Sequence, residues 1–300
     1  MGLNVDLLDT LLFLKNKNLI PNNKNVAEIG AQQLGSSFLE AHKQLENFAN
    51  VFGIKEAVPK FINSTKKITA HGGLEHLAEN APSSQVFWRW AEFQYISIDV
   101  DIQFNSIALD LNFDNLPRKL RNKFSLVTNY GTTEHIANQL NAFKVIHDLT
   151  ALNGIMVHQL PSQGMINHGL VNYNPKFFWM LCRSNDYEVI DFKYGFDTHS
   201  YAFPNNVSDF MDIFHPNSKS LFKDIKVLDA GIQIILRKKH LSNYVAPLDV
   251  PTGAASAGPK FTRRYWSVYK KDPIFSVFTT DSNLTILKKI VMKIIFKRFK

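Results

Sequence analysis

Apolar residues along this chain form short runs of strand length that alternate with segments of helical spacing. The short runs are rich in Ile, Val, Leu, Phe and Tyr, which predicts strands. Seven strands are expected, at 25–29, 94–99, 106–110, 124–129, 155–160, 187–194 and 227–237. Apolar positions at helical spacing predict helices at 3–19, 36–52 and 132–149, and a further helix with Pro175 in its first turn.

This order of elements predicts the α/β class. Strands that alternate with helices pair in parallel, because the helical connection returns the chain to the same end of the sheet. The last two strands, 187–194 and 227–237, have no clear helix between them, which is typical of an antiparallel pair. We therefore expect a Rossmann-like, mainly parallel, seven-stranded sheet with an antiparallel edge strand and helices on both faces.

Breaks in the pattern divide the chain into four expected segments. These are a leading helix within 1–24, an α/β domain over 25–239, a loop or linker extension over 240–282, and a basic amphipathic helix over 283–300. The connection after the first strand is well above the usual crossover length of roughly 10 residues. It predicts an insertion at about 53–93.

The stretch NVAEIGAQQLG, residues 25–35, carries the first candidate site. Its apolar run breaks at Gly30, and a segment with helical spacing follows. A glycine allows a tight turn, and the helix N-terminus behind it offers free N–H groups to a polar ligand. An ordinary strand, turn and helix without a ligand is the alternative. Acidic residues also follow the second and third strands, at Asp99 and Asp110, where carboxylates can accept ribose hydroxyl hydrogen bonds.

Composition narrows the class of protein. The apolar fraction of 45% is that of a globular chain, and the net charge of +8 permits contact with nucleic acid or anionic lipid without requiring it. The single cysteine, Cys182, excludes an intramolecular disulfide framework. The N-terminus lacks a basic n-region, and no run approaches the roughly 18 apolar residues of a spanning helix. We expect a cytoplasmic protein.

The succession of glycine turn, acid-ended strands and later strands resembles the class I S-adenosylmethionine-dependent methyltransferases, over roughly residues 25–239. The strongest block is FSLVTNYGTTEHIANQLNAFKVIHDLTALNGIMVHQLP, residues 124–161, which resembles the strand-helix-strand unit around the fourth and fifth strands of that fold. Two positions depart from the family pattern, because Gln32 and Leu34 stand where further glycines would fall. Asp99 also comes later than the roughly 20 residues usual in dinucleotide folds.

The resemblance implies that the chain binds S-adenosyl-L-methionine. It places Glu28 and Gly30 against the methionine part of the cofactor, and Asp99 at the ribose hydroxyls. Asp110 falls near the adenine amino group, and the loop after the fourth strand reaches the sulfonium and the acceptor. The expected cofactor-binding residues are Glu28, Gly30, Ala31, Gln32, Asp99, Asp110, Asn129, Tyr130 and Gly131.

Candidate bases for removing a proton from the acceptor lie at the strand ends. They are Glu134 and His135 after the fourth strand, His158 on the fifth, and His168 in the next loop. Structural alternatives are that Glu134 only favours a helix N-terminus and that His158 is a core histidine. No spaced ligand motif is present, so no metal is expected, although a histidine site from His135, His158 and His168 is a minor alternative.

Two clusters have both structural and functional interpretations. The aromatic residues between 87 and 95 could line a substrate pocket, and core packing is the favoured interpretation. The basic helix 283–300 is expected to pack with a solvated lysine face, with peripheral membrane or partner contact as the alternative.

The function expected from the sequence is methyl transfer from S-adenosyl-L-methionine to an oxygen or nitrogen of a small molecule or glycan precursor. A nucleic-acid methyltransferase is the second hypothesis, drawing on Arg118, Lys119, Arg121, Lys123 and the basic C-terminal segment. The third is a non-catalytic scaffold that keeps the fold and is tethered by its last helix, because a sheet by itself does not establish a function.

Overall fold

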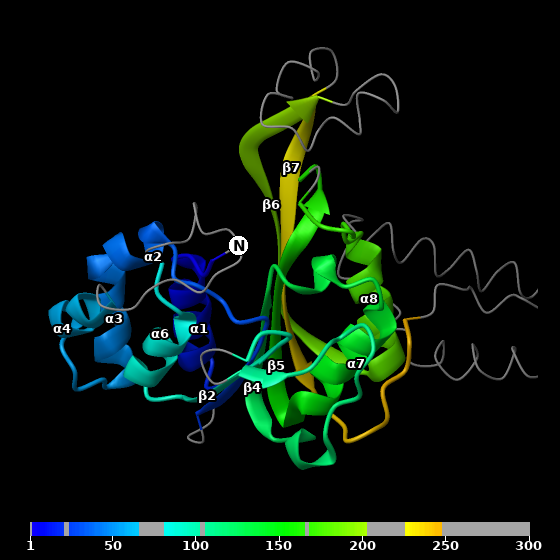
Figure 1. Ribbon diagram of the computed structural model, residues 1–300, viewed down its shortest axis with the longest axis horizontal. Helices are drawn as coiled ribbons and strands as arrows, with labels where there is room; N and C mark the ends of the chain where they lie inside the picture. Colours follow the sequence, from blue (N-terminus) through cyan, green and yellow to red (C-terminus); the bar gives the residue numbers. More distant parts are fainter. Residues whose placement is uncertain are drawn as a thin grey trace, which may run out of the picture. The chain divides into compact units, whose positions relative to one another are not determined.

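The computed structural model (Figure 1) describes six stretches of the chain. They are residues 2–20, 24–65, 81–102, 106–165, 168–202 and 226–247, with only the backbone considered at 36, 196–202 and 226–228. All six lie in the first of two compact units, Met1–Asp249. The expected basic helix at 283–300 and most of the expected linker at 240–282 lie outside the described residues.

The described part of the chain forms a seven-stranded mixed sheet in the order β3-β2-β1-β4-β5-β7-β6. The strands are β1 Asn25–Ile29, β2 Gln94–Asp99, β3 Ser106–Ala108, β4 Phe124–Tyr130, β5 Thr150–Gln163, β6 Tyr187–Ala202 and β7 Lys226–Lys238. Pairing is parallel from β3 across to β5, whereas β7 runs antiparallel to both β5 and β6. This confirms the expected Rossmann-like fold class, with the antiparallel strand β7 lying just inside the edge strand β6.

Helices cover both faces of this sheet, as expected. One group comprises α1 Asp6–Asn16, α2 Ser36–Glu40, α3 His42–Phe52, α4 Val58–Thr65 and α6 Ser84–Trp90. The other comprises α7 Gln139–Leu149 and α8 Pro175–Asn185, and Figure 1 shows the two groups on opposite sides of the sheet. Because side chains alternate along a strand, Val26 of β1 packs with the first group while Ala27 and Ile29 pack with the second.

The leading helix and the inserted segment share one hydrophobic core. Leu7, Leu8, Leu11 and Leu14 of α1 pack in the same cluster as Phe48 of α3. The aromatic residues around α6 belong to this cluster too and are at most 7% exposed, which confirms core packing rather than a pocket wall: Phe87, Trp88, Trp90, Phe93 and Tyr95. The insertion predicted at 53–93 therefore contributes α4 and α6 to the main core.

The region after β4 differs from the sequence prediction. The predicted helix 132–149 is divided into a single 3-10 turn, Thr133–His135, and α7, which begins at Gln139 with Asn138 as its capping residue. The sequence predicts that Asn153 and Gly154 end this helix, which is wrong. Both residues lie inside β5, where the pairing with β4 shifts register. Asn153 takes a φ of 60°, and a Cβ on Gly154 would lie 2.9 Å from the Phe124 carbonyl oxygen.

Several strand bounds differ from the prediction. β5 begins at Thr150 rather than at 155, and β6 continues to Ala202 rather than ending at 194. The third strand was predicted to reach Asp110, but β3 ends at Ala108, and Asp110 begins the turn that follows. β5 continues through Pro161 to Gln163, where the missing N–H of Pro161 falls at a second register shift. Among the described residues, no helix combines the length and apolarity needed to cross a membrane.

Replacing Leu11 with Ala should destabilise the domain by about 2–5 kcal/mol, because this fully buried side chain would leave a cavity between α1 and the sheet. Urea unfolding followed by tryptophan fluorescence measures the change. Asn16→Ala, at an exposed position of the same helix, should change the free energy of unfolding by less than about 0.5 kcal/mol. Equal effects of the two substitutions would contradict the packing of α1 in the core.

Candidate functional site

The carboxyl ends of β1 and β4 meet at the point where the strand order reverses, which is where open α/β sheets bind ligands. Gly30 begins the turn after β1 with a φ of +73° and donates its N–H to the Ile98 carbonyl at the end of β2. A Cβ at this position would lie 2.4 Å from the Thr132 hydroxyl oxygen. That hydroxyl donates to the Ile29 carbonyl at 2.6 Å, so the loop after β4 is closely packed on the turn after β1. We call residues 30–32 the glycine turn.

Asp99 lies directly beside the glycine turn, although 68 residues separate it from Ala31. Its Oδ2 accepts a hydrogen bond from the Ala31 N–H at 2.7 Å, and its Oδ1 accepts from the Asp101 N–H at 3.1 Å. A carboxylate offers about four acceptor positions. The half-buried Asp99 can therefore keep both bonds and still accept from the hydroxyl groups of a ligand.

The side chain of Gln32 has a hydrogen-bond acceptor without a partner in the glycine turn. Its Nε2 donates to the Thr132 hydroxyl at 3.0 Å. Its Oε1 is buried and has no hydrogen-bond partner among the described residues. A buried oxygen without a donor costs free energy, and a ligand N–H group would remove that cost. The other departure from the family pattern, Leu34, packs in the core at 1% exposure and leaves the turn unobstructed.

Glu28 is fully buried one strand position before the end of β1, and its carboxylate accepts four hydrogen bonds from within the chain. Trp88 Nε1 donates to Oε1 at 3.1 Å. Ser84 Oγ, Tyr95 OH and the Gln32 N–H donate to Oε2 at 2.6, 2.8 and 3.0 Å. Burial raises the pKa of Glu28, while these four bonds favour the ionised form. Glu28 therefore holds the glycine turn in place through its bond with the Gln32 N–H. Direct contact of Glu28 with a ligand stays a prediction.

The remaining cofactor candidates lie at different depths. Asn129 is fully buried, and its amide bonds to Thr133 and to His158 Nδ1. Tyr130 is buried on the α1 side of the sheet, beside Thr10. Gly131 turns the chain with a φ of 71° and donates to the Gln159 carbonyl.

Asp110 lies next to the end of β2, because its neighbour Leu109 donates to the Asp99 carbonyl. Its Oδ1 accepts from the Asn112 N–H. Among the expected cofactor-binding residues, Gly30, Ala31, Gln32 and Asp99 are thus the ones that the structure brings together.

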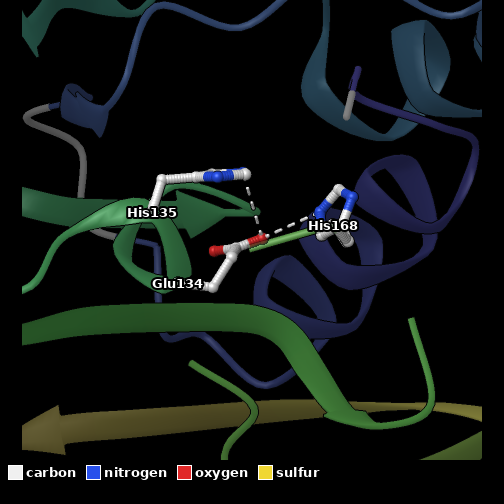
Figure 2. Close-up of side chains that lie close together, drawn as sticks. All are labelled: Glu134, His135 and His168. Carbon is white, nitrogen blue, oxygen red and sulfur yellow. Dashed lines mark hydrogen bonds and ion pairs between the residues drawn. The ribbon is translucent and has the colours of Figure 1, made fainter. Parts of the chain in front are cut away.

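Three of the four candidate bases form one cluster, which we call the Glu134 cluster: Glu134 and His135 after β4, and His168 after β5. Figure 2 shows both imidazoles directed at the Glu134 carboxylate, with the two dashed lines meeting at one oxygen. His168 Nε2 is 3.3 Å from Glu134 Oε1, and His135 Nε2 is 4.0 Å from it. The carboxylate is fully buried, and the imidazoles are partly exposed. Burial lowers the pKa of His135, and the neighbouring Glu134 carboxylate opposes that change.

His158 lies apart from this cluster. Its side chain is 1% exposed and packs against Phe143 and Phe178, with Nδ1 at 3.2 Å from the Asn129 amide. Burial lowers its pKa to about 3, so the imidazole stays neutral at ordinary pH. The structure therefore favours the core-histidine alternative over a catalytic base.

A cavity of about 450 Å³ lies between α1 and the β5–β7–β6 end of the sheet, and we call it the α1 cavity. Its lining includes the carboxylates of Asp6 and Asp9 and the ammonium group of Lys193. Gln159 also lines it, and its carbonyl accepts the Gly131 N–H at 3.0 Å, which connects the cavity to the loop after β4. Its volume is that of a small-molecule site.

No protein-family model and no curated protein matches this sequence. Solved structures with a similar arrangement include a SAM-dependent methyltransferase from Archaeoglobus fulgidus, at 10% identity over 78% of this chain and 95% of that chain, with a TM-score of 0.35. A putative sarcosine dimethylglycine methyltransferase from Galdieria sulphuraria is 9% identical over 78% of this chain and 84% of that chain, with a TM-score of 0.38.

A third structure is the 1,6-didemethyltoxoflavin-N1-methyltransferase of Burkholderia thailandensis, with 1,6-didemethyltoxoflavin and S-adenosylhomocysteine bound. It is 7% identical over 78% of both chains, with a TM-score of 0.35. Because these identities and TM-scores are low, what the present chain binds has to be inferred from its own residues.

Several residues of the site were not singled out from the sequence. Thr132 was predicted only as the first residue of a helix, yet its hydroxyl joins the glycine turn to the loop after β4. Gly169 packs against Glu134, where a Cβ would lie 2.8 Å from Glu134 Cγ. Asp6 and Asp9 were assigned to an ordinary leading helix. Each depends on contacts distant in sequence, which no local pattern reports.

The fit between Gly30 and Thr132 can be measured with a double-mutant cycle. Gly30→Ala should cost more than about 2 kcal/mol, because the new Cβ meets Thr132 and the left-handed backbone itself costs roughly 1–2 kcal/mol for a side chain. In a Thr132→Ala background the cost should fall toward the backbone contribution. Urea unfolding of the four proteins measures the coupling, and strictly additive costs would contradict the close packing.

The acid stability of the domain should depend on His158. Its pKa of about 3 in the folded chain lies below its ordinary value of 6.5, so the unfolded chain binds the proton first as the pH falls. Stability is therefore retained above pH 6.5 and lost progressively below it, by up to about 1.4 kcal/mol per pH unit. His158→Phe should show a shallower loss between pH 6.5 and 4 in urea unfolding. Parallel curves for the two proteins would contradict a buried neutral imidazole.

Proposed function

We propose that this protein is an S-adenosyl-L-methionine-dependent methyltransferase that acts on an oxygen or nitrogen of a small molecule, with a glycan precursor as one such acceptor. The observation that carries the proposal is the hydrogen bond between the Asp99 carboxylate and the Ala31 N–H. It joins the acid at the end of β2 to the glycine turn after β1, at the switch point of the sheet. This is where a nucleoside ligand needs both a ribose acceptor and close backbone approach.

The residues present fit this cofactor. The glycine turn offers its backbone to the methionine part of the cofactor, and the buried, unpartnered Gln32 Oε1 can accept a hydrogen bond from the ammonium group of that part. Asp99 would accept from the ribose hydroxyls, and Asp110 lies one strand further along the same edge. When bound, the cofactor supplies a methyl group on a positively charged sulfur.

Methyl transfer then needs an acceptor atom held in line with that carbon. The chain's own part would be to hold the acceptor oxygen or nitrogen at the carboxyl ends of β1 and β4 and to take up its proton. The acceptor's proton passes to a base. Glu134, after β4, or His168, after β5, would serve, because both belong to the Glu134 cluster at the carboxyl ends of these two neighbouring strands. Positioning supplies much of the rate in such a reaction.

The α1 cavity is the proposed place for the acceptor. It adjoins the loop after β4, and the charged residues in its lining are Asp6, Asp9 and Lys193. Lys193 is itself paired with Asp191 at 3.3 Å, so the lining favours polar acceptors that carry hydroxyl or amine groups. The cavity size supports a small molecule rather than a polymer.

The nucleic-acid hypothesis receives less support from the basic residues that suggested it. Arg118, Lys119, Arg121 and Lys123 precede β4, whereas the glycine turn lies at the opposite end of the parallel strands β1 and β4. A strand of this length separates the two ends by roughly 20 Å. The tethered-scaffold hypothesis depends on residues 283–300, which lie outside the described residues, and on Gln32 and Leu34, neither of which obstructs the turn.

Titration calorimetry with S-adenosylhomocysteine tests the proposal. The full chain should bind one equivalent, and Asp99→Ala should weaken the affinity by about 10- to 100-fold, because a hydrogen bond to a charged group is worth about 1.5–3 kcal/mol. Asp99→Asn should fall between the two, since it keeps an acceptor for the Ala31 N–H but loses the charge.

Glu46→Ala is the matched control. It removes a carboxylate from an exposed position of α3, outside the glycine turn, and should leave the affinity unchanged. Absence of binding by the folded wild-type chain would refute the methyltransferase proposal. Binding that Asp99→Ala leaves intact would refute the assignment of the ribose acid.

A further inference from the structure

We propose that Glu134, His135 and His168 form a binding site for one divalent transition-metal ion. The three side chains offer one carboxylate oxygen and two imidazole nitrogens, and these ligand atoms all lie within 4.8 Å of one another. Two histidines and one carboxylate are a donor set that binds Zn²⁺ and other first-row divalent ions while leaving coordination positions open.

The distances suit an ion after small side-chain rotations. Ligand atoms about 2.1 Å from one ion lie roughly 3–3.4 Å from each other. The separation of His168 Nε2 from Glu134 Oε1 is already 3.3 Å, and that of His135 Nε2 is 4.0 Å. The His135 side chain is 45% exposed, so its imidazole can turn toward the ion without disturbing the core.

Burial separates this cluster from an ordinary surface group of polar residues. The Glu134 side chain is fully buried, and its Oε2 has no hydrogen-bond partner among the described residues. A buried carboxylate needs a counter-charge and partners for its lone pairs. The two histidines next to it are 45% and 28% exposed, which leaves a path for an ion to enter from solvent.

The backbone holds the two halves of the cluster together. Leu170 N–H and Val171 N–H both donate to the Glu134 carbonyl, at 2.8 and 3.1 Å. Gly169 lies against the Glu134 side chain, where any larger residue would collide. His168 is therefore carried to Glu134 by a fixed loop contact, which preorganises the ligand atoms.

The site's place in the molecule suggests a role for the ion. The backbone N–H of His168 donates to the Met165 carbonyl, and Met165 lines the α1 cavity. The open coordination positions would take oxygen atoms of the methyl acceptor and orient them, a role that rests on the proposed methyltransferase function. With the ion bound, this role would replace that of Glu134 and His168 as bases, because their lone pairs would then be held by the metal. Binding of the ion itself does not depend on that function.

Calorimetric titration of the metal-stripped full chain with Zn²⁺ tests the site, with Mg²⁺ as the comparison ion. One equivalent of Zn²⁺ should bind, and Mg²⁺ should bind far more weakly because it prefers oxygen ligands. His135→Gln, His168→Gln and Glu134→Gln should each weaken Zn²⁺ binding by more than about 100-fold. His42→Gln, at an exposed position of α3 outside the cluster, is the control and should bind as the wild type does.

His135→Gln is the most informative substitution, because this side chain is 45% exposed and its replacement removes little buried packing. Circular dichroism can verify that the variant keeps the fold. Titration with Co²⁺ adds a spectroscopic readout, since loss of a histidine ligand should alter its visible absorption. Zn²⁺ binding that His135→Gln and His168→Gln leave unchanged, or no stoichiometric binding at all, would overturn the proposed site.

The same samples separate this inference from the proposed function. Binding of S-adenosylhomocysteine without binding of Zn²⁺ would overturn the metal site and leave the methyltransferase proposal standing. Binding of Zn²⁺ without S-adenosylhomocysteine would support the metal site and count against the methyltransferase. Tight, cluster-dependent Zn²⁺ binding in a chain that also binds S-adenosylhomocysteine supports both.

Discussion

A single buried carboxylate connects most of the parts from which the site is built. Glu28, on the interior strand β1, receives hydrogen bonds from α6, from β2 and from the glycine turn. An unpaired carboxylate in this position would be costly, so its four donors must be in place together. Because Ser84 and Trp88 belong to the helix that ends the long connection after β1, this interaction also fixes where that connection returns to the sheet. The glycine turn, which is the proposed cofactor-binding turn, is thus held in place by a hydrogen bond to a buried carboxylate.

Thr132 has a comparable role on the other side of the turn. Its hydroxyl donates to the end of β1 and accepts from Gln32, while its side chain occupies the space that only a glycine at position 30 leaves open. The proposed cofactor side and the proposed acceptor side therefore meet at one residue. Two positions further along, Glu134 begins the cluster that we assign to a metal ion. A small movement of the loop after β4 would therefore change both the glycine turn and the Glu134 cluster.

Much of the fold could be predicted from the sequence, because β1, β2 and β4 are short apolar runs with clear ends. The bounds of β1 and β2 agree with those expected, and the parallel part of the sheet follows from strand-helix alternation. The errors arose where tertiary contacts override local signals. Asn153 and Gly154 look like a helix terminator, yet they accommodate a register shift between β4 and β5. For the site, Gly30 and Asp99 were recognisable, whereas the partners of Glu28 and the contact of Gly169 with Glu134 depend on residues far apart in the chain.

The separation of the partners along the chain has a consequence for folding. Asp99 and Ala31 are 68 residues apart, and the bonds of Thr132 to Gln32 and Ile29 span 100 and 103 residues. Contacts of such long range close late and make folding slow, because the intervening chain must first lose its freedom. The ligand-binding edge of the sheet should therefore be among the last parts to become ordered as the chain emerges and folds. A ligand that recognises only the finished edge would draw the folding equilibrium toward the native chain, so the abundance of the protein in a cell would follow the supply of its own ligand.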